Sequence, residues 1–183
     1  VISFMNRTGR TLFLGCLMLL PLFAQAGDNS LLIPATGRCS LDTLPEDLPD
    51  ALAACRQAAI DGDAQAQFEL GEYYYDGQRT PRELPQALSW FEKASLQGHA
   101  QAQHRLGSMF FRGEGVQANN VQAYIVLKMA AVNGSEEALD SADLVSVQMR
   151  REELEIASQV LGQIFRNYLL ELQDAEAGSP FSP

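Results

Sequence analysis

A sequence that repeats itself at a fixed interval predicts an all-α fold, here a short α-α solenoid with a C-terminal capping helix. Shifting the chain by 36 residues brings Gly62 onto Gly98 and places the stretch GDAQAQFELG over GHAQAQHRLG. Within each copy, small and apolar residues recur four apart, as at Ala66 and Leu70, which is the spacing of one helical face. Self-similarity at a period of this length is the signature of stacked helical repeats.

The N-terminal residues have the composition of a secretory signal peptide. Arg7 and Arg10 precede an apolar run over residues 12–23, and small residues follow it. We therefore expect cleavage after Ala26, export to the periplasm and no stable membrane span in the remaining chain. Two alternatives stay open: the segment is retained and tethers the protein to the membrane, or Cys16 is lipidated.

Acidic residues outnumber basic ones in this chain. With 23 Asp and Glu against 13 Lys and Arg, the formal net charge is −10, and the removal of Arg7 and Arg10 makes it −12. A surface of this charge repels nucleic acid and anionic lipid, so we expect neither as a partner.

Cys39 and Cys55 are the two cysteines that remain after cleavage. An even number in an oxidising compartment favours a disulfide. The bridge would close a loop of about 16 residues and destabilise the unfolded chain by roughly 3 kcal/mol. The alternatives are two buried free thiols or, with no histidine nearby in the sequence, a metal pair.

Each repeat predicts two helices. The first is expected near residues 64–75 with Asp63 as its N-cap, because aspartate accepts hydrogen bonds from the first turn. The second is expected near residues 85–97, where a proline suits the first turn and Gly98 suits the left-handed residue after the end. The same register makes Ser135 the expected N-cap in the third unit.

Gly71 and Gly107 stand at the same phase inside the first helices. A glycine in a helix interior costs about 1 kcal/mol relative to alanine, so its recurrence needs a reason. We expect the backbone of a neighbouring helix to press close at both positions.

The stretch from Gly62 to Gly98 resembles a Sel-one-like repeat, a subfamily of the tetratricopeptide-like helical arrays, here of an exported bacterial type. The residues that carry the resemblance are Ala64, Ala66, Gln67, Leu70, Gly71, Tyr74, Gly77, Ala87, Trp90, Phe91, Ala94 and Gly98. The second copy has Val126 in place of the tryptophan, and the third has Asp143 in place of the helical glycine. We therefore interpret the third copy as a terminal one.

The resemblance and the composition together predict a domain organisation. The predicted segments are a signal peptide (1–26), an irregular segment (27–50), a repeat array of about two full units with partial flanking ones (51–143), capping helices (144–175) and a tail (176–183). The capping segment has a broad apolar face made of Leu154, Ala157, Leu161, Ile164, Phe165, Tyr168 and Leu172. A solenoid needs a cap over its open end, so capping is the main interpretation and a homodimer through this helix is the alternative.

Arrays of this class present the first helices of successive units on a concave surface, and the resemblance implies that this surface binds another protein or an extended peptide. Contact residues are expected to vary where scaffold residues repeat. The predicted groove residues are Glu69, Glu72, Tyr73, Tyr75 and Asp76 in one unit, and Arg105, Ser108, Met109, Phe111 and Arg112 in the next. Tyrosine and arginine are good interface anchors.

No group of residues in the sequence has the spacing of a catalytic, metal or cofactor site. His99 and His104 are five apart, which does not place them on one helical face, and the serines have no evident base. We expect His99 at a solvated helix start and His104 as a packing residue. The sequence thus predicts a non-enzymatic adaptor or scaffold without cofactor. The alternatives are an envelope-assembly factor that handles polysaccharide or peptidoglycan, and a membrane-tethered subunit of a larger envelope machine.

Overall fold

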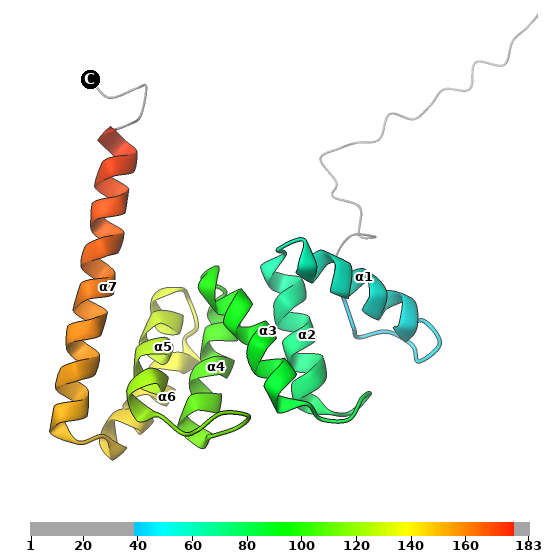
Figure 1. Cartoon of the computed structure of the whole chain (residues 1–183), viewed down its shortest axis with the longest axis horizontal. Coiled ribbons are helices and arrows are strands. Elements are labelled where there is room, and N and C mark those ends of the chain that lie inside the picture. The colour runs from blue at the N-terminus through cyan, green and yellow to red at the C-terminus, as the bar shows by residue number, and fades with distance from the viewer. Residues whose placement is uncertain (1–38, 178–183) are drawn as a thin grey trace, which may run out of the picture. The chain divides into compact units, whose positions relative to one another are not determined.

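The computed structural model describes residues 39–177, which form seven α-helices and no strand (Figure 1). The helices are α1 (Leu48–Ile60), α2 (Ala64–Asp76), α3 (Leu84–Leu96), α4 (Ala100–Arg112), α5 (Asn120–Val132), α6 (Glu137–Gln148) and α7 (Arg151–Ala177). Each of the first five packs on the next along the chain, and α7 packs on α5. The predicted all-α solenoid is confirmed.

Some expectations fall beyond this range. The cleavage site after Ala26, the lipidation candidate Cys16 and the final residues 178–183 lie outside the described residues. Among the helices that are described, none is both long enough and apolar enough to cross a membrane. The predicted segment boundaries after residues 50 and 143 fall inside α1 and α6. Helix α6 continues past residue 143 because it is the first helix of a third unit.

The first helices of the first two units begin and end in the same way. Asp63 and His99 stand at the N-cap, and each side chain accepts a hydrogen bond from the backbone N–H three residues on, at 2.7 and 3.2 Å. Gly77 and Gly113 end these helices in the left-handed conformation, with φ of 66° and 69°. Polar N-caps and left-handed C-terminal glycines therefore set the length of both helices.

Ser135 does not cap α6, so this prediction is wrong. Helix α6 begins one residue later than expected, with Glu136 at the N-cap, and no side chain caps its first turn. The Ser135 N–H bonds to the carbonyl of Ala130 at 2.9 Å, as the N–H groups of Asp63 and His99 bond to Ala58 and Ala94, so the three units differ only in the side chain. The Ser135 side chain is buried, and Oγ has no hydrogen-bond partner in the described structure.

The helical glycines receive large side chains from the second helix of their own unit. A Cβ at Gly71 would lie 2.4 Å from Cε1 of Phe91, and one at Gly107 would lie 2.6 Å from Cγ of Leu127. Phe91 and Leu127 are both buried and occupy the same phase of α3 and α5. The expectation of a close backbone is therefore wrong at Gly71, whereas at Gly107 the carbonyl oxygen of Ala123 also comes within 3.3 Å.

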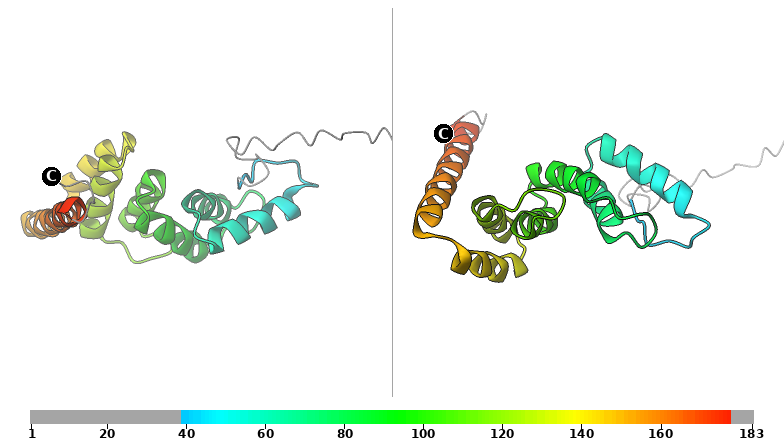
Figure 2. Two further views of the ribbon diagram at one scale, coloured as in Figure 1. Left: turned by 90° about the horizontal axis from the view of Figure 1, so that it is seen from above. Right: turned by 60° about the horizontal axis from the view of Figure 1, so that its bottom comes forward.

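The third unit lacks this interlock. Asp143 and Gln163 stand at the positions of the glycine and the large side chain, and both are exposed. Helix α7 packs mainly on α5, beside which it rises in Figure 1, and the right view of Figure 2 shows it turning away from the end of α6. The lost glycine that marked the third copy in the sequence thus coincides with a different path for its second helix.

A buried glutamine in the first helix of each of the first two units links three helices. Gln103 Nε2 donates to the carbonyl of Ser95 at the end of α3 (3.0 Å), and its Oε1 accepts from Asn133 at the end of α5 (2.8 Å). Gln67 repeats both bonds one unit earlier, to Ala59 (3.0 Å) and from Gln97 (2.8 Å). Both glutamines are at most 5% exposed. The amide therefore fixes the stacking of one unit on the next.

We expect Gly71→Ala to lower the free energy of unfolding by about 1–3 kcal/mol. The new methyl group meets the buried Phe91 ring, and this overpacking outweighs the gain in helix propensity. Urea denaturation of the purified protein measures the change. Asp143→Ala, at the same phase of α6 but exposed, is the matched control and should change stability by less than about 0.5 kcal/mol. Equal effects of the two substitutions would contradict the interlock.

Candidate partner-binding surface

An ion pair joins the first helices of the two complete units. Arg105 on α4 donates from Nη2 to Oε2 of Glu72 on α2 at 2.9 Å, and its Nε lies 2.7 Å from Oε1 without an aligned hydrogen bond. The Glu72 side chain is only 20% exposed, whereas that of Arg105 is 43% exposed. One cationic edge of the guanidinium therefore remains open to solvent.

Burial raises the pKa of Glu72 above its ordinary 4.5, and the Arg105 charge opposes this rise only in part. Because the pKa of Glu72 is higher in the folded than in the unfolded chain, the protonated carboxyl contributes to stability at a pH below the unfolded pKa. This contribution is lost as the pH rises through the folded pKa. Glu72 therefore takes up a proton in milder acid than a solvated carboxylate does, and the pair with Arg105 is then broken.

Tyr75 is the centre of a second polar group beside this pair. Its hydroxyl donates to Glu114 Oε2 at 2.8 Å, and the guanidinium groups of Arg82 and Arg105 lie 4.8 and 5.5 Å from its ring centroid. Burial and the Glu114 carboxylate raise the pKa of the Tyr75 hydroxyl. These contacts tie α2 to the loops before α3 and after α4, so Tyr75 is anchored within the chain.

A cavity of about 180 Å³ opens beside the ion pair. It is lined by Leu41, Asp42, Glu69, Glu72, Tyr73, Asp76, Gln78 and Arg79. Arg79 hydrogen-bonds the carbonyl of Leu41 and pairs with Asp42 at 3.3 Å, so the segment after Cys39 forms one wall. Four of the lining residues are predicted variable positions, and the structure brings them together.

The disulfide Cys39–Cys55 holds that wall on α1. Leu41 lies two residues after Cys39 and is buried with Leu70 and the small residues of α1 and α2. The predicted bridge is therefore present in the structure, and it shapes the cavity as well as restricting the unfolded chain.

Comparison with protein families decides what kind of scaffold carries this surface. The Sel1 repeat model matches residues 64–99 and again residues 100–135, which correspond to the two units with the glycine interlock. Residues 64–135 are thus two Sel1 repeats. The resemblance inferred from the repeated residues is confirmed, and Sel1 repeats are generally a non-catalytic scaffold that mediates protein–protein contacts.

Solved structures give the same fold. The protective antigen c5321 of uropathogenic Escherichia coli, which displays an SLR fold, aligns over 76% of this chain and 31% of its own, with 27% identity and a TM-score of 0.64. A Sel1 repeat protein from Oxalobacter formigenes aligns over 53% of this chain and 40% of its own, with 32% identity and a TM-score of 0.51. The chain thus spans less than half the length of either protein. No curated protein matches it.

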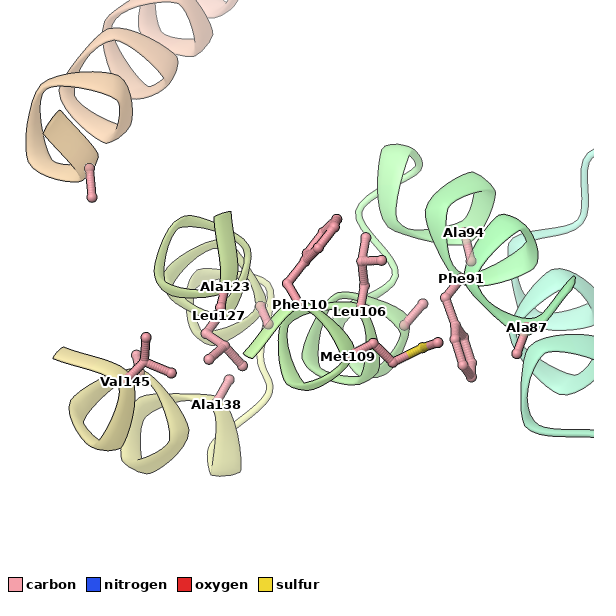
Figure 3. Packing of buried hydrophobic residues seen from close by; sticks show 14 of the residues in the cluster. Ala87, Phe91, Ala94, Leu106, Met109, Phe110, Ala123, Leu127, Ala138 and Val145 are labelled. Atoms are coloured by element: carbon pink, nitrogen blue, oxygen red, sulfur yellow. The ribbon is translucent and has the colours of Figure 1, made fainter. Parts of the chain in front are cut away.

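The remaining residues of the predicted groove differ in how far they are exposed. Met109 is fully buried and points toward Phe91 (Figure 3), so its assignment to the binding surface is wrong. Tyr73 and Phe111 are half-buried against the core, Ser108 is half-buried, and Arg112 is exposed. Methionine at a variable position gave no sequence signal of its burial, because the equivalent residue of the first unit is Tyr73.

The two histidines are held by hydrogen bonds. His99 caps α4 through Nδ1, so its Nε2–H donates to Gln65 at 2.9 Å, and burial lowers the pKa of the ring. His104 Nε2 lies 3.0 Å from Ser141 Oγ, and its Nδ1 lies 3.8 Å from the Glu137 carboxylate. This arrangement was not evident in the sequence, because it joins α4 to α6.

The His104 contact does not activate the serine. Ser141 Oγ donates its proton to the Glu137 carbonyl at 3.0 Å, so His104 is the donor and Ser141 the acceptor in their shared bond. A general base needs the opposite arrangement. In residues 39–177, no three His, Cys, Asp or Glu side chains are grouped so that they could hold a metal ion.

The sequence reasoning missed Arg82 and Glu114, although both contact Tyr75. They lie in the loops before α3 and after α4, where the repeat register is weak. The only sequence signal is Glu114 itself, since Gln78 occupies that position in the preceding unit.

Arg105→Gln should raise the pKa of Glu72 further, because the arginine charge and its hydrogen bond both lower that pKa in the wild type. Carbon-13 NMR of the side-chain carboxyl carbon during an acid titration measures the shift. Arg82→Gln is the matched control, since Arg82 contacts Tyr75 and Glu114 instead, and it should leave the Glu72 titration unchanged. A Glu72 pKa unaffected by Arg105→Gln would show that the ion pair does not persist in solution.

Proposed function

We propose that this chain is an exported, non-enzymatic adaptor that holds another protein, or an extended segment of one, on the surface formed by α2 and α4. The contact residues are Glu69, Glu72 and Tyr73 on α2, together with Arg105, Ser108 and Arg112 on α4. Tyr75 and Phe111 support them from beneath. The proposal rests on the family's general role in protein–protein contact and on this chain's own non-repeating residues.

The observation that carries the proposal is the change of residue type on a repeated scaffold. Gly71, Gly107 and the buried glutamines occupy the same phases and make the same contacts in both units. Between them, Glu72 and Arg105 face each other, with a cavity beside Glu72 and an exposed Arg112 beyond. Such a surface offers a tyrosine and two arginines, which are enriched among residues that dominate binding energy.

Export is supported by the disulfide and by the N-terminal pattern. Structural disulfides persist in oxidising compartments, and Cys39–Cys55 closes the wall of the cavity. A periplasmic location would therefore preserve the shape of the proposed contact surface, whereas a reducing compartment would release the segment around Leu41.

The proposal is tested by affinity capture from envelope extract. Tyr73→Ala, Arg105→Ala and Arg112→Ala combined should abolish retention of at least one protein that the wild type retains, because truncating several anchors together typically costs on the order of 100-fold or more in affinity. Quantitative mass spectrometry of the retained proteins gives the readout.

A matched variant tests whether losing polar surface residues elsewhere has the same effect as losing the proposed contact residues. Ser89→Ala combined with Glu92→Ala changes exposed residues of α3, away from α2 and α4, and should retain the wild-type set. Both variants must keep the wild-type helical circular dichroism. Retention of the same proteins by the triple variant would refute the proposed surface.

A further inference from the structure

Helix α7 is too long for the helix on which it packs. Its 27 residues span about 40 Å at 1.5 Å per residue, whereas the 13 residues of α5 span about 20 Å. The apolar face of α7 is buried at Ala157 and Leu161 but becomes 38% exposed at Phe165 and 57% exposed at Tyr168. The same face therefore continues beyond α5 without cover from the described chain. The side chain of Leu172, at its far end, is outside the described residues.

This overhang makes one wall of a groove of about 780 Å³. Ile164, Phe165, Tyr168 and Leu169 of α7 form that wall, and Leu96 and Val132 at the ends of α3 and α5 stand opposite. Leu96 is 89% exposed and Val132 is 65% exposed. The hydrogen-bonded amides of Gln103 and Asn133 also line it. None of the lining residues is charged, although the chain carries a net charge of −10.

We propose that the groove is the interface of a homodimer, in which the overhanging half of α7 from each copy lies in the groove of the other. The overhanging half of α7 forms one wall of its own groove and also has an apolar face that can enter a second groove. A twofold axis between two copies therefore fills both grooves at once. A symmetric dimer requires a self-complementary patch of this kind.

The exposed area is sufficient for such an interface. Tyrosine and phenylalanine carry about 150–250 Å² each, so side chains at these exposures present on the order of 100 Å² apiece. Leu96, Val132, Phe165, Tyr168 and Leu169 together then offer roughly 500 Å² per copy, or about 1,000 Å² in the pair, which is the size that a specific interface needs.

The charge distribution also favours a second copy at this place. Two strongly acidic chains repel each other wherever their charged surfaces meet, and the groove is a region where uncharged side chains meet instead. An apolar contact between like-charged copies should strengthen as salt screens the repulsion, which is the opposite of an association held by ion pairs.

The test is sedimentation equilibrium of the purified protein, as the cell processes it, over a concentration series up to about 100 µM. The wild type should be a monomer–dimer equilibrium whose dissociation constant falls as salt is raised. Leu96→Glu and Leu169→Glu should each raise that constant about tenfold or more, because each buries a charge in an apolar contact.

Ile60→Glu is the matched control. Ile60 ends α1 at the same phase at which Leu96 ends α3, and it is 71% exposed but lies outside the groove. It should leave the dissociation constant within about twofold of the wild type. Helical circular dichroism confirms that each variant is folded.

Three results would overturn the proposal. A wild type that stays monomeric throughout the series would show that the groove is occupied by something other than a second copy, such as a helix of another protein. A dimer unaffected by both groove variants, or one weakened equally by Ile60→Glu, would place the interface elsewhere.

Discussion

The buried amide of Gln103 is the contact on which the stacking of this chain depends. It reaches back to the carbonyl of Ser95 at the end of the preceding unit and receives Asn133 from the end of its own unit. Backbone carbonyls at a helix C-terminus have no partner within the helix, so a side chain that bonds one fixes the neighbouring helix in position and in rotation. Because Gln67 repeats the arrangement, the spacing of the units is set by two equivalent amides.

Both surfaces of interest follow from that stacking. It brings α2 beside α4, so that Glu72 and Arg105 pair across the junction and leave a cavity whose far wall is held by a disulfide. It also fixes the ends of α3 and α5, between which the amides line the apolar groove. The third unit has neither the glycine nor the large side chain that locks the second helix down, and its second helix, α7, packs on α5.

The repeated residues could be predicted and the unrepeated contacts could not. Phase identified the helices and the importance of Gly71, which recurs 36 residues later, and residue type identified the N-cap at Asp63. It did not show that the neighbour at Gly71 is the Phe91 ring, since both a backbone and a side chain require a glycine there. Met109 was misplaced because the register links it to a half-buried tyrosine, and Glu114 was missed because Gln78 occupies its position in the preceding unit, so repetition did not mark it.

The central claim, that the amides join the units, is tested most directly by the stability of Gln103→Leu against Gln101→Leu. Leucine fills a similar volume but cannot bond to Ser95 or Asn133, whereas Gln101 is exposed on the same helix. Urea denaturation should show a loss of about 1–3 kcal/mol for Gln103→Leu, and less than about 0.5 kcal/mol for Gln101→Leu. A Gln103→Leu protein as stable as the wild type would mean that the glutamine only fills space, and the account of unit stacking would be wrong.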